Sequence, residues 1–125
     1  MRTLIVEDNV TFRNTFKEVL CNKFPLMVVE EAMNGAEAME KVETFLPELV
    51  FMDIRLPGET GLELTKKIKA SHPQILIIIL TDYNLPEYQK AAFDSGADDF
   101  VVKGSLNPAA IEALVKSICS GRDLE

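Results

Sequence analysis

Short runs of apolar residues alternate along the chain with longer stretches in which apolar residues recur every three or four positions. The short runs predict strands, and the longer stretches predict amphipathic helices. The runs cover residues 4–6, 27–29, 49–52, 75–80 and 100–102. Regular alternation of strand and helix is typical of a parallel sheet with helices on both faces. The pattern therefore predicts an α/β protein, a three-layer sandwich with five parallel strands and five helices.

The character of each run indicates how deeply its strand is buried. Four of the runs show little polar alternation, which is typical of strands covered on both faces. The second run is followed directly by Glu30 and Glu31. We therefore expect the second strand at an edge of the sheet and the other four to be buried on both sides.

Capping residues and prolines predict where the helices begin and end. Asn34, with Glu37 three positions later, is a reciprocal cap for the second helix. The third helix is expected over residues 61–71 before Pro73, the fourth from Pro86 to Gly96, and the fifth from Asn107 and Pro108 to Gly121. The apolar faces of the first two helices are expected to be buried, and they comprise Phe12, Phe16, Val19, Leu20, Met39, Val42 and Leu46.

The length of 125 residues suits one domain, which we expect over residues 1–121. Residues 122–125 are expected to be a tail, either a linker stub or the remnant of an added tag. No apolar run approaches the 18 or so residues of a membrane span, and the N-terminus does not resemble a signal peptide. A soluble, cytoplasmic protein that does not contact membranes is expected.

Acidic residues outnumber basic ones by 20 to 13, which gives a net charge of −7 and a pI near 4.7. Such a surface repels a phosphate backbone, so this domain is not expected to bind nucleic acid itself. Cys21 and Cys119 lie far apart without metal-ligand spacing, and we expect both to be reduced thiols in or near the core.

Candidate chemistry lies directly after the apolar runs, because open parallel sheets bind ligands at the carboxyl ends of their strands. These positions hold Glu7, Asp8, Asp53, Thr81 and Lys103. Carboxylates brought to about 4 Å repel each other by roughly 4 kcal/mol per pair at an effective dielectric constant of 20, so a hard divalent cation is expected between them. Oxygen ligands with open positions favour Mg²⁺. The ammonium and hydroxyl groups then suit an anion, most simply a phosphoryl group.

Four ordered segments resemble the receiver domain of bacterial two-component response regulators. They are Leu4-Ile5-Val6-Glu7-Asp8-Asn9, Asp53-Ile54-Arg55-Leu56-Pro57-Gly58-Glu59-Thr60-Gly61, Leu80-Thr81 and Gly96-Ala97-Asp98-Asp99-Phe100-Val101-Val102-Lys103. The resemblance covers essentially the whole chain. It implies a flavodoxin-like (βα)5 fold with the strand order 2-1-3-4-5.

Roles around the acceptor follow from the resemblance. Asp53 is expected to accept a phosphoryl group. Asp8 and Asp53 are expected to bind Mg²⁺ directly, Glu7 through water, and Arg55 through its backbone carbonyl.

The resemblance implies further roles on the neighbouring strands. Thr81 is expected to turn toward the phosphoryl oxygens and Phe100 to rotate inward after it, while Lys103 pairs with the phosphoryl group. Pro57 and Gly61 are expected to shape the loop behind the acceptor.

Two positions depart from the family pattern. Gly104 follows Lys103 where a cis-proline is common, and Asp82 follows Thr81 where a small residue is frequent. Asp82 is expected either to repel phosphodonors or to orient a hydrolytic water. Arg55 is expected to shield the phosphoryl group or to pair with Asp82 or Glu59.

The implied function is Mg²⁺-dependent transfer of a phosphoryl group to Asp53 from a sensor histidine kinase, a phosphotransfer protein or a small phosphodonor. Phosphorylation would switch a surface of the fourth helix, fifth strand and fifth helix, with homodimerisation as one outcome. Such a domain is a signalling module, not an enzyme beyond self-phosphorylation and self-dephosphorylation. A DNA-binding domain after residue 125 would add transcription regulation.

Other function classes remain open. A Mg²⁺-dependent phosphohydrolase with an aspartyl nucleophile uses similar groups, although D-x-D is usual at its first strand and this chain has Glu7-Asp8. A pseudo-receiver that only binds partners is a second alternative, if Asp82 and Gly104 disable the switch. A flavin module is disfavoured because acids occupy its phosphate loop.

Overall fold

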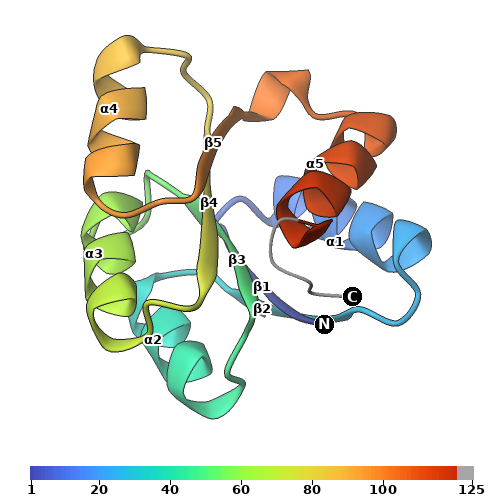
Figure 1. The fold of residues 1–125 in the computed structure, drawn as a ribbon, viewed down its shortest axis with the longest axis horizontal. Coiled ribbons are helices and arrows are strands. Elements are labelled where there is room, and N and C mark those ends of the chain that lie inside the picture. Colours follow the sequence, from blue (N-terminus) through green and yellow to red (C-terminus); the bar gives the residue numbers. More distant parts are fainter. Residues whose placement is uncertain (121–125) are drawn as a thin grey trace.

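Strand and helix alternate strictly along residues 1–120, which are the residues that the structure, a computed structural model, describes (Figure 1). The strands are β1 (Arg2–Val6), β2 (Val28–Ala32), β3 (Leu49–Asp53), β4 (Leu76–Thr81) and β5 (Asp99–Val102). The helices are α1 (Val10–Lys23), α2 (Gly35–Thr44), α3 (Gly61–Ser71), α4 (Pro86–Asp94) and α5 (Pro108–Ser120), with a short 3-10 helix, η1 (Lys103–Ser105). The predicted cap Gly121, the domain boundary at 121 and the tail 122–125 lie outside the described residues.

All strand pairs are parallel, and the sheet has the order β2-β1-β3-β4-β5. Figure 1 shows α2, α3 and α4 on one face of the sheet and α1 and α5 on the other. The expected three-layer, flavodoxin-like sandwich is confirmed. Because the strands are parallel and in register, with Asp53 beside Leu80 and Thr81 beside Val102, their carboxyl ends share one edge.

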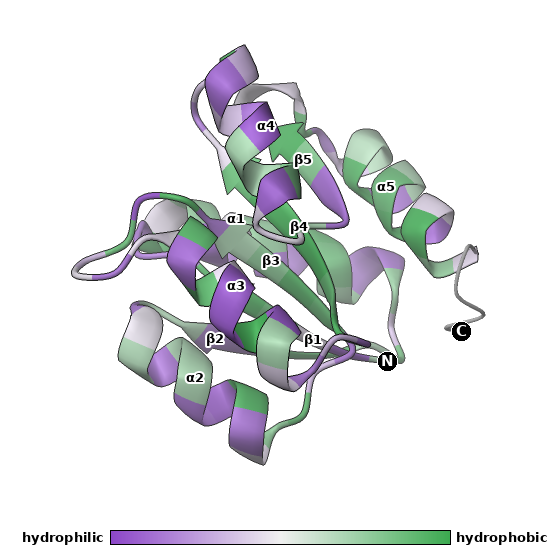
Figure 2. Cartoon of the chain, turned by 60° about the vertical axis from the view of Figure 1, so that its left-hand side comes forward, coloured by the Kyte–Doolittle hydropathy of each residue, from purple (hydrophilic) through white to green (hydrophobic). Residues whose placement is uncertain are grey.

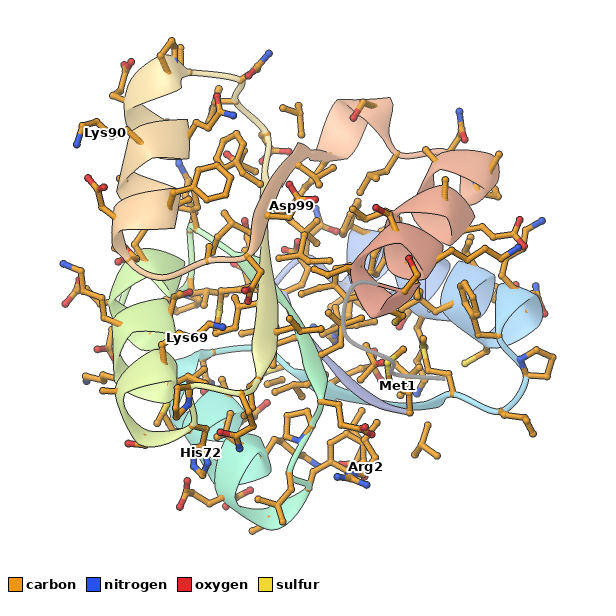
Figure 3. The ribbon with its side chains drawn as sticks, viewed as in Figure 1. Met1, Arg2, Lys69, His72, Lys90 and Asp99 are labelled. Atoms are coloured by element: carbon orange, nitrogen blue, oxygen red, sulfur yellow. The ribbon has the colours of Figure 1, made fainter. Side chains whose placement is uncertain are left out.

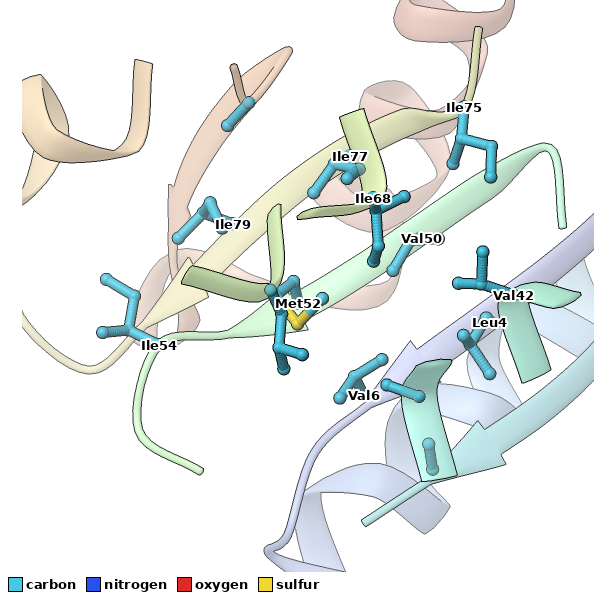
Figure 4. Close-up of a cluster of buried hydrophobic side chains, with 14 of the residues drawn as sticks. Leu4, Val6, Val42, Val50, Met52, Ile54, Ile68, Ile75, Ile77 and Ile79 are labelled. Atoms are coloured by element: carbon cyan, nitrogen blue, oxygen red, sulfur yellow. The ribbon is translucent and has the colours of Figure 1, made fainter. Parts of the chain in front are cut away.

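Two apolar layers hold the helices to the sheet, one on each face. Alternate residues of a strand point to opposite faces. Val50 and Met52 of β3 therefore pack under α2 and α3, as Figure 4 shows, whereas Leu49 and Phe51 pack under α1 and α5. Figure 2 shows the apolar colour on the central strands, whereas α2, α3 and α4 carry both colours.

The prediction of an edge position is confirmed for β2, but its residue range was wrong. Glu30 and Glu31 lie inside the strand, not beside it. Each acid points to a helix that supplies a cation. Glu30 pairs with Lys41 of α2 at 2.5 Å, and Glu31 pairs with Arg13 of α1 at 3.0 Å. These ion pairs explain how an edge strand accommodates two carboxylates.

The fifth run was also expected to be buried on both sides, and that expectation is wrong. β5 forms the other edge of the sheet, and all four of its residues are only half-buried. A short apolar run does not reveal how many strands flank it.

Most helix ends agree with the caps predicted from the sequence. Asn34 Oδ1 accepts the N–H of Glu37 at 2.9 Å, while the Glu37 carboxylate reaches back to the N–H of Met33, one residue before the expected position. α4 begins at Pro86, and Asn107 caps α5 by accepting the N–H of Ala110.

Two predictions of buried side chains are wrong. Leu46 lies beyond the end of α2, has a positive φ of 54° and is 51% exposed. Cys21 is exposed on the outer side of α1, whereas Cys119 is buried; neither forms a disulfide. Among residues 1–120, no helix combines the length and apolar character required to cross a bilayer.

Thr3→Val is expected to stabilise the protein. The Thr3 side chain in β1 is fully buried, and its Oγ1 has no hydrogen-bond partner among the described residues. Valine has the same shape without the desolvated hydroxyl, so the free energy of unfolding should rise by about 1 kcal/mol. Thr65 is the matched control, because it is equally buried but donates to the Gly61 carbonyl at 2.8 Å. Urea unfolding should show no gain for Thr65→Val; a gain there, or a loss for Thr3→Val, would contradict the argument.

Candidate functional site

The polar residues predicted at the strand ends gather at the carboxyl edge of the sheet. Glu7 and Asp8 follow β1, and Asp53 ends β3. Each of these three carboxylates has an oxygen within 4.8 Å of the other two. Glu7 and Asp53 are buried, while Asp8 is exposed. The cluster could therefore bind a metal that is reached from the surface.

The site is divided by the faces of the sheet. Glu7, Asp53 and Lys103 continue the alternation of strand residues that face α1 and α5. Thr81 and Phe100 belong to the opposite set, whose neighbours pack under α2, α3 and α4. Of the two groups predicted to bind an anion, Lys103 thus lies on the α1 and α5 side of the sheet, whereas Thr81 lies with Phe100 on the opposite side.

Lys103 is the cation between the buried carboxylates in this structure. Its Nζ lies 2.5 Å from Glu7 Oε1 and 3.5 Å from Asp53 Oδ1. It also lies 4.7 Å from the centre of the Phe12 ring in α1. The sequence predicted a metal ion to relieve the repulsion and did not predict that Lys103 relieves part of it.

The pKa values of Asp53 and Lys103 are both shifted by their surroundings. Burial raises the pKa of Asp53 to about 7, with the negative charge of Glu7 as the next cause; the Lys103 ammonium works in the opposite direction. Burial alone would lower the pKa of Lys103, but the close contact with Glu7 and the charges of Asp53, Glu7 and Asp82 outweigh it and raise that pKa. In the absence of a metal, the ionised form of Asp53 is therefore less favourable than that of an ordinary aspartate, while the contact with the carboxylates favours the charged form of Lys103.

Glu7 is held in place by α1. Its side-chain Oε2 accepts a hydrogen bond from the N–H of Asn9 at 3.0 Å. Its backbone carbonyl accepts a hydrogen bond from Nη1 of Arg13 at 2.7 Å. The Nε of Arg13 donates to Glu31 of β2 at 3.0 Å. Sequence reasoning missed Arg13, because a basic residue in the first turns of a helix resembles any solvated charge.

The loop behind Asp53 is closed by an unusually tight approach. The Gly61 N–H donates to the Ile54 carbonyl at 2.9 Å, and a Cβ on Gly61 would lie 2.0 Å from the Asp53 carbonyl oxygen. Thr60 caps α3 by accepting the N–H of Glu63. This close approach agrees with the role in shaping the loop that was predicted for Gly61. Pro57, the other residue predicted to shape the loop, is exposed.

The predicted switch residues lie on the α4 side. Thr81 Oγ1 accepts the N–H of Tyr83 at 3.2 Å, so the hydroxyl engages the β4–α4 loop. Phe100 is half-buried against the apolar layer under α2, α3 and α4. After β5, Lys103 opens η1, and residues 1–120 contain no cis peptide bond.

The segment that leads into β5 is fixed by Asp98. Its Oδ2 accepts Nζ of Lys69 at 2.7 Å and the N–H of Ile77 at 2.9 Å. Figure 3 shows Lys69 on α3, the helix beside β4. These bonds set the start of β5 against β4, which in turn positions Lys103 at the far end of the strand.

Arg55 forms an ion pair with neither Asp82 nor Glu59, so the expected pairing is wrong, while the expected shielding of a phosphoryl group stays a prediction. Glu59 pairs with Lys67 of α3 at 2.5 Å. The guanidinium instead lies 4.6 Å from the centre of the Tyr83 ring. Nothing in the sequence pattern indicates this aromatic partner two residues after Thr81.

The fold and the site together define a flavodoxin-like domain with an acidic cluster at the carboxyl edge of its sheet. A family model, the response regulator receiver domain, matches residues 3–116. The chain belongs to this family, the receiver domains of two-component response regulators.

Known proteins similar to the chain include one of about the same length and longer regulators. It is 34% identical over 113 residues to the chemotaxis protein CheY of Halobacterium salinarum, covering 90% of the chain and 92% of CheY. It is also 34% identical to the oxygen regulatory protein NreC of Staphylococcus carnosus, covering 91% of the chain but 53% of NreC. The chain thus spans about half the length of NreC.

Solved structures agree with the fold. A CheY-like receiver domain protein from Methanospirillum hungatei JF-1 superimposes with a TM-score of 0.88 at 29% identity, covering 98% of this chain and 95% of that one. A DNA-binding response regulator of the LuxR family from Staphylococcus aureus gives a TM-score of 0.83 at 30% identity, covering 95% and 96%.

Proposed function

We propose that this receiver domain accepts a phosphoryl group on Asp53 in a Mg²⁺-dependent reaction and thereby switches a partner-binding surface. The donor is the phosphohistidine of a sensor kinase or phosphotransfer protein, or a small phosphodonor. The observation that carries the proposal is the buried Asp53 with a second carboxylate, Glu7, and the Lys103 ammonium beside it.

The donor set fits magnesium. The cluster consists of carboxylates from Glu7, Asp8 and Asp53, without His or Cys, and oxygen ligands of this kind suit a hard cation. We assign Asp8 and Asp53 as direct ligands, Glu7 as a ligand through water, and the Arg55 carbonyl as the fourth contribution. When bound, Mg²⁺ supplies positive charge that favours ionised Asp53 and offsets the charge of the transferring group.

The chain's own residues perform the transfer. An ionised carboxylate oxygen of Asp53 forms a bond to phosphorus while the bond from phosphorus to the donor histidine nitrogen breaks, and that nitrogen keeps the electron pair. Lys103 favours the ionised form of Asp53 and then pairs with the phosphoryl oxygens, in exchange for its contact with Glu7.

Charge carries the subsequent switch. Moving a conformer pair from 1:99 to 99:1 takes about 5.5 kcal/mol, more than the roughly 1 kcal/mol of a neutral hydrogen bond. A phosphoryl dianion offers Thr81 a charge-assisted hydrogen bond and Lys103 an ion pair. As Thr81 leaves Tyr83, Phe100 rotates inward, and the surface of α4, β5 and α5 changes.

The relatives support a proposal for the biological setting. NreC is an oxygen regulatory protein, and the LuxR-family neighbour is a DNA-binding response regulator. We infer a cytoplasmic signalling domain over residues 1–121 that is not an enzyme beyond self-phosphorylation and self-dephosphorylation. Its outputs are partner binding, homodimerisation on phosphorylation, or transcription control through a DNA-binding domain elsewhere in a longer chain.

Acetyl phosphate with Mg²⁺ is expected to add one phosphoryl group to the wild-type protein and none to Asp53→Asn. Removing Mg²⁺ should lower the yield at least about tenfold, because a metal contributes several kcal/mol to such a transition state. Intact-mass spectrometry measures the adduct. Asp94→Asn, which removes an exposed carboxylate from α4, is the control and should label like wild type.

Undiminished labelling of Asp53→Asn would remove the proposal. Rapid release of inorganic phosphate by the wild type, without an adduct that persists after the donor is removed, would instead favour the phosphohydrolase alternative.

A further inference from the structure

Three side chains connect the loop after β3 with the loop after β4. Arg55 lies two residues after Asp53, and Tyr83 lies two residues after Thr81. The Arg55 guanidinium lies 4.6 Å from the centre of the Tyr83 ring. Tyr88 of α4 interacts with the same guanidinium, and its ring lies 6.4 Å from that of Tyr83. We call Arg55, Tyr83 and Tyr88 the loop clamp.

The loop clamp acts on Thr81 through Tyr83. The backbone N–H of Tyr83 donates to Thr81 Oγ1 at 3.2 Å, while the ring of the same residue faces Arg55. Thr81 is 3% exposed. Its hydroxyl is therefore held toward the loop as long as Tyr83 keeps this position. Turning the hydroxyl toward Asp53 requires that this bond is given up.

The partners of Arg55 in the unmodified protein, Tyr83 and Tyr88, are uncharged. The guanidinium is exposed, and it forms no ion pair with a carboxylate of residues 1–120. An exposed cation–π contact is weaker than the charge-assisted, bidentate bonds that a guanidinium forms with phosphate oxygens. A phosphoryl group two residues away along the chain would therefore compete for Arg55.

We propose that Arg55 is a positioning residue that holds the β4–α4 loop in its resting position by stacking on Tyr83, and that it moves to the phosphoryl group when Asp53 is modified. The second half of this proposal rests on the proposed phosphorylation of Asp53. Modification then does two things together: it gives Thr81 a new acceptor, and it releases the restraint that held Thr81 to the loop.

The resting clamp is tested in the unmodified protein without metal or phosphodonor. Arg55→Ala and Tyr83→Leu should each speed hydrogen exchange at the Tyr83-position amide by about two- to fivefold, the loss of one exposed cation–π contact. The double variant should add little to either. Tyr83→Phe keeps the aromatic face and should exchange like wild type. Lys67→Ala, which removes a neighbouring cation paired with Glu59, is the matched control and should leave the rate unchanged.

A merely space-filling role for Tyr83 would give the opposite pattern. Equal exchange rates in Tyr83→Leu and wild type, or additive effects in the double variant, would overturn the resting clamp.

The transfer of Arg55 is tested by adding Mg²⁺ and beryllofluoride, a phosphoryl mimic. NMR should show that the Arg55 side-chain protons lose the ring-current shift that they have in the free wild type, and Tyr83→Leu should lack that shift from the start. An unchanged ring-current shift, while the Asp53 amide responds to the mimic, would overturn the transfer. If the Asp53 amide does not respond to the mimic, the proposed function is overturned, and the transfer of Arg55 with it. The resting clamp is then decided by the hydrogen-exchange rates alone.

Discussion

Metal-free Asp53→Asn is expected to be more stable than the wild type by on the order of 3 kcal/mol at pH 8, and to match it near pH 4. The fold crowds Asp53 against Glu7 at a buried position, and Lys103 compensates only in part. Asparagine has nearly the same shape and no charge at any pH. The substitution therefore removes an electrostatic cost while keeping the packing.

The pH dependence follows from the raised pKa of Asp53. In the fold this pKa is about 7, with burial as the first cause and the charge of Glu7 as the second, whereas an ordinary aspartate has a pKa of 3.8. The folded protein thus binds more protons than the unfolded chain between about pH 4 and 7. Wild-type stability should fall as pH rises through this interval and level off above it.

Urea unfolding in the presence of a chelator measures this difference. Asp8→Asn is the matched control, because Asp8 belongs to the same cluster but is exposed, and its effect should be much smaller. Millimolar Mg²⁺ should stabilise the wild type more than Asp53→Asn, since it binds the folded state through these carboxylates. A difference between wild type and Asp53→Asn that does not change with pH would contradict the assignment.

The arrangement of elements was largely predictable because it depends on local patterns. Apolar runs with capping residues between them gave the alternation of strand and helix, and Pro86 and Asn107 gave two helix starts. The strand order came from the resemblance to receiver domains, since no periodicity encodes it. The burial of β5 was misjudged for the same reason, because edge positions depend on neighbours that are distant in sequence.

The candidate site was predictable in its members but not in their contacts. Parallel strands bring their ends to one edge, so the ends of the apolar runs pointed to Asp53 and Lys103. The ion pair of Lys103 with Glu7 and the stacking of Arg55 on Tyr83 depend on side-chain directions across different loops. No spacing in the sequence indicates either contact.

Gly61→Ala is expected to be the most destabilising small substitution near the site. The new Cβ would lie 2.0 Å from the Asp53 carbonyl oxygen, a backbone atom of β3 that no rotamer change can move. Either the start of α3 or the end of β3 must shift, and the bond from the Gly61 N–H to Ile54 stretches with it. We expect a loss of about 3 kcal/mol or more in the free energy of unfolding, a large share of the stability of a typical domain.

Whether Gly61→Ala loses or gains stability shows which of two effects dominates, the close approach to Asp53 or the helix propensity of alanine. Alanine forms helices better than glycine by about 1 kcal/mol, so Gly61→Ala at the start of α3 would stabilise the protein if the approach to Asp53 were loose. Gly104→Ala is the matched control, because no atom lies within 4 Å of its Cβ position and the change should stay within about 0.5 kcal/mol. Equal urea midpoints for the two variants would mean that α3 can withdraw from Asp53 without cost. A large loss confined to Gly61→Ala, with weakened phosphoryl labelling of Asp53, would mean that this glycine sets the position of the acceptor.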